Sequence, residues 1–97
     1  MNIQALMRQA QAMQKEVQKA QEEVGKMEFT SKKELVEVTV NGNKEVLSVK
    51  IDENIEKDDI EVLQDMILLA TNEAISKANV EMEKRLGKYS QAMPGLF

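Results

Sequence analysis

The apolar residues of this chain follow two different periods, and any fold must satisfy both. Over the first 27 residues they recur at alternating spacings of three and four, the pattern of a helix that packs along another helix. This seam consists of Ile3, Leu6, Ala10, Met13, Val17, Ala20, Val24 and Met27. Because the seam includes alanines, it buries little apolar surface, and we expect the helix to need a second helix beside it.

After Met27 the period changes to two. Two runs alternate β-branched or aliphatic residues with polar ones, which is typical of half-buried strands. These runs are Val36-Glu37-Val38-Thr39-Val40 and Leu47-Ser48-Val49-Lys50-Ile51. Asn41-Gly42-Asn43 lies between them, and an Asn-Gly step is a strong hairpin signal. With a third short strand at Met27 to Ser31, the segment 27–52 is predicted to form a three-stranded antiparallel meander.

A second long helix is predicted to begin near Asp58, a suitable N-cap with Glu61 three residues later. Its apolar residues between 60 and 75 cover more than one face, so we expect it to pack on its own sheet and on a partner chain. Gly87 is expected to end it. The predicted dimer interface consists of Ile60, Leu63, Met66, Ile67, Leu68 and Ala70.

These elements predict one α+β domain. Its 97 residues fall within the usual size of a single domain and allow only a modest core, which dimerisation would enlarge. We expect an arm helix over 1–26, the antiparallel sheet over 27–52, a dimer-core and arm helix over 58–87, and a loosely ordered tail over 88–97.

The composition argues against several classes of function. The chain has no cysteine and no histidine, so disulfides, thiolate zinc sites and the usual general base are absent. The acidic run from Asp52 to Asp59 lacks the glycine turn and ligand spacing of a calcium loop. No apolar run approaches the ~20 residues that span a bilayer, and nothing marks the start for export. We expect a cytoplasmic protein with no catalytic residues, metal, cofactor, small-molecule substrate or membrane partner.

The formal charge of −4 is unevenly distributed along the chain. Residues 1–33 carry six basic and four acidic groups, and residues 74–97 carry four and two, so both ends are +2. Residues 52–73 carry one basic and eight acidic groups, a net of −7. If the two helices pack antiparallel, the basic ends meet at one tip far from the sheet. Local field decides where a polyanion approaches, so this tip predicts binding to duplex DNA.

The predicted DNA contacts are the basic residues of these two ends. They are Arg8, Lys15 and Lys19 on the first helix and Lys77, Lys84, Arg85 and Lys88 on the second. Two plainer interpretations stay open. Any solvated helix face carries such residues, and Lys77 or Arg85 can pair with Glu81 along the helix surface.

Three stretches and the C-terminal residues resemble the YbaB/EbfC family of nucleoid-associated proteins. The stretches are LMRQAQAMQKEVQKAQEEV at 6–24, LVEVTVNGNKEVLSVKID at 35–52 and LQDMILLATNEAISKA at 63–78, followed by the closing MPGLF. The resemblance implies an α–β–α subunit, a tweezer-like homodimer with helical arms, duplex-DNA binding, and a role in nucleoid organisation and gene regulation. Family members usually carry glycines before the Leu-Val strand, where this chain has Ser31-Lys32-Lys33-Glu34.

A function of another class also fits the sequence. The thin alanine seam and the overall acidity suit an interaction module whose helical arms hold a protein client or adaptor. Binding that survives nuclease treatment would distinguish this alternative from DNA binding.

Overall fold

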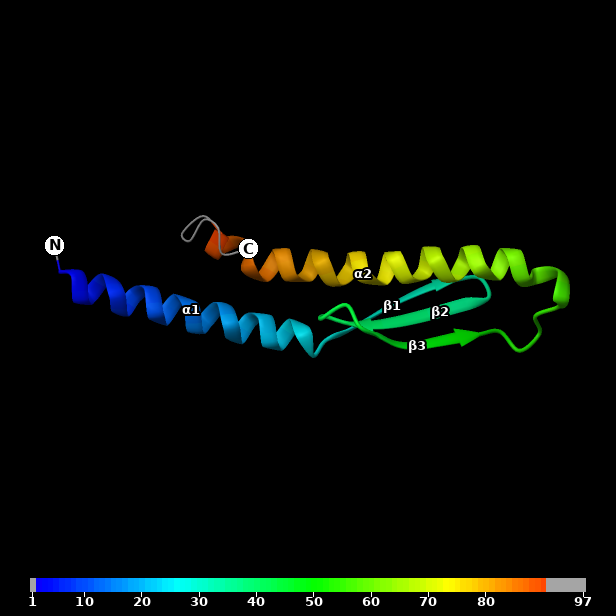
Figure 1. Ribbon diagram of the computed structural model, residues 1–97, viewed down its shortest axis with the longest axis horizontal. Coiled ribbons are helices and arrows are strands. Elements are labelled where there is room, and N and C mark those ends of the chain that lie inside the picture. The colour runs from blue at the N-terminus through cyan, green and yellow to red at the C-terminus, as the bar shows by residue number, and fades with distance from the viewer. Residues whose placement is uncertain (1, 91–97) are drawn as a thin grey trace.

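Two long helices and a three-stranded sheet make up the computed structural model, which describes residues 2–90 (Figure 1). The elements, in chain order, are α1 (Ile3–Gly25), β1 (Glu28–Lys33), β2 (Val36–Asn41), β3 (Val46–Ile51), the 3-10 turn η1 (Lys57–Asp59) and α2 (Ile60–Ser90). The molecule is elongated, about 70 Å in its longest dimension. The predicted fold class, with a long helix on each side of an antiparallel meander, is confirmed.

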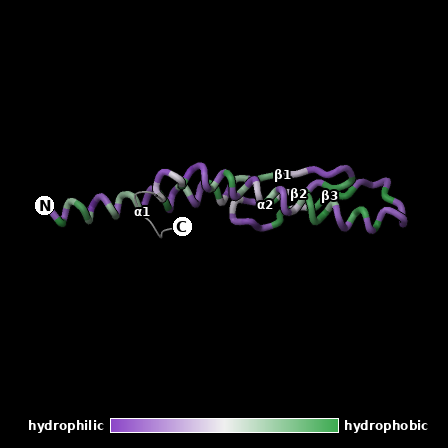
Figure 2. The backbone as a smooth tube through the Cα atoms, turned by 90° about the horizontal axis from the view of Figure 1, so that it is seen from above, coloured by the Kyte–Doolittle hydropathy of each residue, from purple (hydrophilic) through white to green (hydrophobic). Residues whose placement is uncertain are grey.

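Helix α1 is capped at its start and only half covered along its length. The Asn2 side-chain oxygen accepts hydrogen bonds from the backbone nitrogens of Gln4 (3.0 Å) and Ala5 (3.3 Å), satisfying groups that a helix start leaves free. Hydrophobic and hydrophilic positions alternate along its whole length (Figure 2). The seam is buried at Val17 and Val24 but exposed toward the N-terminus, where Ile3 is 69% accessible.

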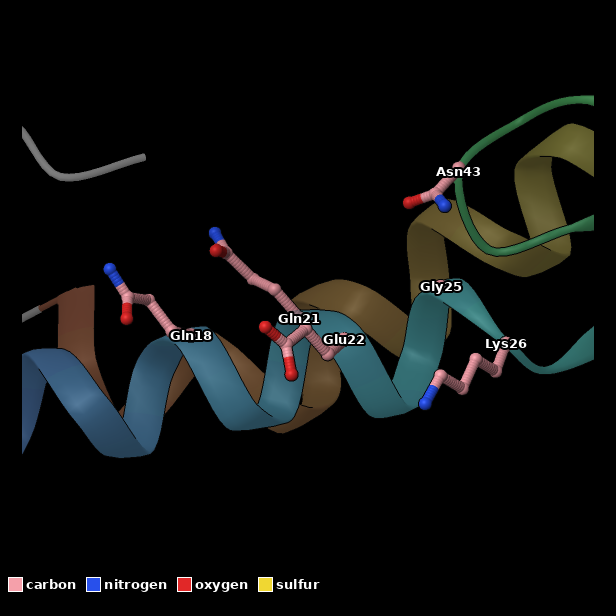
Figure 3. A pocket seen from close by; sticks show the side chains of 6 residues that line it. All are labelled: Gln18, Gln21, Glu22, Gly25, Lys26 and Asn43. Carbon is pink, nitrogen blue, oxygen red and sulfur yellow. The ribbon is translucent and has the colours of Figure 1, made fainter.

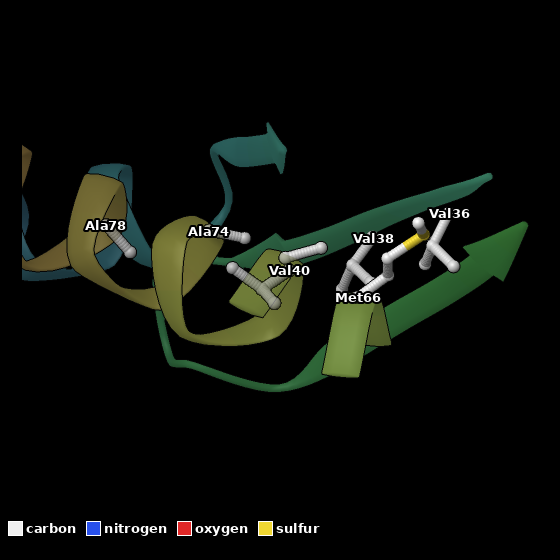
Figure 4. Close-up of a cluster of buried hydrophobic side chains, with 7 residues drawn as sticks. Val36, Val38, Val40, Met66, Ala74 and Ala78 are labelled. Atoms are coloured by element: carbon white, nitrogen blue, oxygen red, sulfur yellow. The ribbon is translucent and has the colours of Figure 1, made fainter. Parts of the chain in front are cut away.

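The sheet has the strand order β1-β2-β3, with both pairs antiparallel. Alternation sets its two faces, because Val36, Val38 and Val40 point toward α2 while Glu37 and Thr39 point away. The valines pack against a row of small residues spaced four apart on α2, so helix and sheet approach closely (Figure 4). The buried core consists of Val36, Val38, Val40, Met66, Ala70, Ala74 and Ala78.

The predicted hairpin turn between β2 and β3 is present, but its positive φ falls on a different residue from the glycine. The Asn41 backbone nitrogen bonds the Glu45 carbonyl at 3.0 Å, and the residue with positive φ is Lys44 (67°) rather than Gly42. Gly42 is required for space: a Cβ there would lie 1.8 Å from the carbonyl oxygen of Val24 at the end of α1. The turn therefore docks directly on the C-terminal end of α1.

The ends of α2 correct two sequence-based boundaries. The start is organised by Glu56 and Asp59, not by Asp58 and Glu61, because the Glu56 backbone nitrogen donates to Asp59 Oδ2 at 2.8 Å. The helix then runs through Gly87 to Ser90, so Gly87 does not end it. Residues 88–90 of the predicted tail are helical, and residues 91–97 lie outside the described residues.

Helix α2 covers only part of the sheet, lying over β1 and β2. Lys77 Nζ donates to the Thr30 carbonyl at 2.7 Å, and Lys33 pairs with Glu73, so two lysines tie α2 to β1. The Lys33 ammonium holds the pKa of Glu73 below its ordinary value of 4.5. On β3, the residues of the same face stay exposed, including Val49 at 44% and Ile51 at 41%.

Two glycine substitutions should move stability in opposite directions. Gly42→Ala forces its methyl group into the backbone of Val24, and overpacking of this kind costs about 1–3 kcal/mol. Gly87→Ala meets nothing within 4 Å and replaces a helical glycine, which stabilises a helix by up to about 1 kcal/mol. Urea unfolding of both variants measures the difference. Equal stability of Gly42→Ala and the wild type would contradict the docked turn.

Candidate nucleic-acid interface

The end of the molecule away from the sheet is an arm made of two antiparallel helices. The second half of α1 packs against the last turns of α2 in a small apolar cluster of its own. Its members are Val17, Leu86 and Tyr89, with Met13, Ala20 and Met82 packed around them. The predicted need of α1 for a helical partner is thus met within the subunit. The first ten residues of α1 are all exposed.

Four basic side chains form a straight line on the solvent face of α1 and its C-cap residue Lys26, which we call the α1 stripe: Arg8, Lys15, Lys19 and Lys26. Lys15 and Lys19 are each two residues from the buried Val17 in the sequence, and Arg8 and Lys26 are each nine residues from it. At about 100° per residue, all four lie within about 20° of the direction opposite Val17. The stripe is about 27 Å long, at about 1.5 Å per residue.

The α1 stripe is the part of the arm whose cations are free. All four side chains are exposed, and none makes a hydrogen bond or ion pair with another residue between 2 and 90. Glu22 is the acidic residue nearest to this line on the helix, one turn before Lys26. An unpaired, solvated lysine or arginine is the group that neutralises a phosphate with release of counterions.

The basic residues of α2 are mostly engaged inside the fold. Arg85 pairs with Glu81 (Nε to Oε1, 2.8 Å) and approaches Glu23 of α1 (3.6 Å). Lys88 Nζ lies 4.9 Å from the ring centre of Tyr89, whose hydroxyl donates to Glu16 (3.2 Å). The cleft between the two helices is lined by Arg85, Lys88 and Tyr89 of α2 and by Glu16, Lys19 and Glu23 of α1. The pairing of Arg85 with Glu81 that the sequence left open is therefore present, and it offsets the charge of Arg85.

The prediction that the basic ends of the two helices meet at one shared tip is wrong. Lys77 lies over β1, not on the arm. The contact between Tyr89 and Glu16 sets the register of the two antiparallel helices. Arg8 precedes Glu16 by eight residues and lies farther out along the arm, whereas Lys84 precedes Tyr89 by five residues and lies nearer the sheet. Arg8 and Lys84 are therefore about 20 Å apart along the arm axis. Lys84 is also about 160° around α2 from Leu86, which faces α1. The α1 stripe and Lys84 thus point to opposite sides of the arm, because each helix turns its polar face away from the other.

The predicted dimer residues separate into three groups by their exposure. Met66 and Ala70 are buried against their own sheet, at 8% and 0% accessibility, so they are not available to a partner. Leu63 and Ile67 are partly buried there, whereas Ile60 and Leu68 are exposed. The open face of β3 could not be predicted, because alternation alone does not show which strands a helix covers. The seven-residue spacing from Lys19 places Lys26 on the same basic face of the first helix, but the predicted DNA contacts did not include it.

The acidic segment lies at the other end of the molecule. Residues 52–73 follow β3 and comprise the connecting loop, η1 and the first turns of α2. The loop and η1 lie at the end of the sheet away from the arm (Figure 1). Among residues 2–90, no three ligating side chains gather as a metal site would require. Neither helix, within the same residues, has the length and apolarity needed to cross a membrane.

The structure is that of a slender α–β–α protein with an unpaired cationic stripe on its arm and acidic residues at the opposite end, an arrangement that suits a polyanionic partner. The comparison with known families identifies its family. Residues 1–93 match the model of the YbaB/EbfC DNA-binding family, so the chain belongs to that family.

Relatives support the assignment at the level of sequence and of structure. A nucleoid-associated protein of Enterococcus faecalis is 39% identical over 97% of this chain and 93% of its own length. A nucleoid-associated protein of Staphylococcus saprophyticus is 47% identical over 73% of this chain and 70% of its own. The crystal structure of an uncharacterized protein from Helicobacter pylori superposes with a TM-score of 0.75 at 26% identity, covering 94% of this chain and 98% of that one.

Proposed function

We propose that this protein binds duplex DNA through the α1 stripe and contacts mainly phosphates. One observation carries the proposal: Arg8, Lys15, Lys19 and Lys26 are aligned, exposed and unpaired within residues 2–90 of a chain whose net charge is −4. A stripe of about 27 Å spans about eight base-pair steps at 3.4 Å each, so one duplex can contact all four. The acidic residues of the segment 52–73 orient the protein on DNA, because they repel the duplex from the sheet end.

The remaining predicted contacts take secondary places in this proposal. Lys88 stands at the edge of the cleft beside Lys19, close enough to add to the field of the stripe. Arg85 and Lys77 are engaged by carboxylates and by a carbonyl, and Lys84 faces the other side of the arm, where it suits a second duplex. With no recognition helix of the helix-turn-helix kind, we expect low sequence specificity. The role that follows is non-enzymatic: nucleoid organisation and gene regulation in the cytoplasm, on the nucleoid.

We also propose that the working unit is a homodimer joined at the sheet end. Helix α2 is tied to β1 by Lys77 and leaves the inner face of β3 open. That face carries Val46, Val49 and Ile51, and Ile60 stands at the start of the α2 flank beside it, each at least 41% accessible. A second copy covers such a surface symmetrically and adds its own apolar residues, so two arms project from one core.

A protein client remains a second candidate, and one observation favours it. At the N-terminal end of α1, Ile3, Leu6 and Met7 are exposed at 69%, 48% and 56% on or near the face that packs on α2 further along. Such a half-covered seam is a typical surface for a partner helix. Capture of a partner that persists after nuclease digestion supports this function over DNA binding.

Reversing two charges of the α1 stripe tests the DNA proposal. Lys15→Glu with Lys19→Glu should weaken binding to all duplexes alike. The slope of log K against log salt should fall by about 1.8, since each phosphate contact contributes about 0.9. A gel-shift titration at several salt concentrations measures both quantities.

Lys50→Glu with Lys57→Glu is the matched control, because it makes the same change in net charge at the sheet end. It should leave the salt slope unchanged. Equal losses in the two double variants would mean that net charge, and not the stripe, governs binding, and no binding at low salt would refute the proposal.

The dimer is tested by placing a charge on the open face of β3. Val49→Glu should convert the dimer to a monomer, because a buried unpaired carboxylate at an interface is strongly unfavourable. Sedimentation equilibrium gives the mass. Val80→Glu, at a 60% exposed apolar position of α2 outside this surface, should stay dimeric. A dimeric Val49→Glu would place the interface elsewhere.

A further inference from the structure

A polar groove of about 580 Å³ lies at the root of the arm, where the β2–β3 turn meets the end of α1. It is lined by Gln18, Gln21, Glu22, Gly25, Lys26 and Asn43. The amides of Gln18 and Gln21 project to the same side of α1, and the Asn43 amide extends from the turn over that side (Figure 3). None of these three amides makes a hydrogen bond to another residue between 2 and 90.

The position of the Asn43 amide is fixed by its surroundings. Asn41 organises the turn, its Oδ1 accepting from the backbone nitrogens of Asn43 (2.9 Å) and Glu45 (3.0 Å). The Gly42 nitrogen donates to the carbonyl of Met27, just after α1, at 3.0 Å, which holds the turn beside the C-terminal end of that helix. At Gly25 a Cβ would lie 2.8 Å from Asn43 Oδ1, so this glycine makes the space in which the amide rests. The side chain of Asn41 therefore stabilises the turn itself, whereas the side-chain amide of Asn43 is available to bind a ligand.

The chemistry of the groove differs from that of the α1 stripe, which it adjoins at Lys26. Three amides offer both donors and acceptors, whereas the Glu22 carboxylate only accepts. A phosphate would be repelled by that carboxylate. The amino groups of bases, in contrast, donate to carboxylates and amides, and a glutamine or asparagine amide pairs with adenine through both N6 and N7.

We infer that this groove reads base edges, so that a duplex held on the α1 stripe is also selected at the root of the arm. Lys26 contacts the phosphate beside the groove, and Gln21 with Asn43 favours adenine. This inference rests on the proposed DNA binding and adds to it a local base preference. It concerns only the few base pairs nearest the turn, so most contacts remain independent of sequence.

Selection from a pool of random duplexes, followed by sequencing of the bound fraction, tests the inference. The wild-type protein should enrich adenine at a defined position by at least about fivefold, the discrimination that one good amide–base pair supports. Gln21→Ala with Asn43→Ala should reduce that enrichment to less than about twofold and leave the salt slope of total binding unchanged. Gln64→Ala with Asn72→Ala removes the same two amide types from exposed positions of α2 and should keep the enrichment.

Each other outcome has one meaning. A wild-type protein that binds with a normal salt slope but enriches no base overturns the inference and leaves the proposed function standing. Enrichment that persists in Gln21→Ala with Asn43→Ala also overturns it. A wild-type protein that binds no duplex at low salt overturns the proposed function and the inference together.

Discussion

The structure depends on one helix packing against two different surfaces. The first two thirds of α2 lie on the sheet through a row of small residues that includes Ala70, Ala74 and Ala78, and its last turns hold α1 through Leu86 and Tyr89. Because α2 is continuous across both contacts, the direction of the arm relative to the sheet is fixed. The docking of Gly42 on the end of α1 adds a second constraint at the root. An arm held at two points is rigid enough to present a line of charges.

This packing also decides which charges are free. Where the two helices meet, Arg85 and Tyr89 bond carboxylates of the arm, so that cleft is close to electrically balanced. Along the outer face of α1, the side chains of the α1 stripe are exposed and have no partners among residues 2–90, although Lys19 also borders this cleft. A chain with a net charge of −4 therefore carries a positive face, and the acid of residues 52–73 is kept at the far end. Separation of charge, more than total charge, makes a polyanion an acceptable partner.

Much of the fold could be predicted from the sequence because periodicity reports burial directly. The spacing of Val36, Val38 and Val40 specified the central strand, and the seam of α1 specified a helical partner. The arm was harder to predict. The hypothesis of a shared tip assumed that the helix ends coincide, but register and facing depend on tertiary contacts such as that between Tyr89 and Glu16. The same limit applies to Met66 and Ala70, whose apolar character does not tell whether their own sheet or a partner covers them.

Differential lysine acylation, with and without a bound duplex, reports on each face of the arm separately. If the duplex lies along the α1 stripe, Lys15, Lys19 and Lys26 should react more slowly when DNA is bound at low stoichiometry. Lys57, at the acidic end, should react at an unchanged rate. Protection of Lys84 with full reactivity at Lys15 and Lys19 would show instead that the duplex lies on the opposite side of the arm, and would refute binding along the α1 stripe.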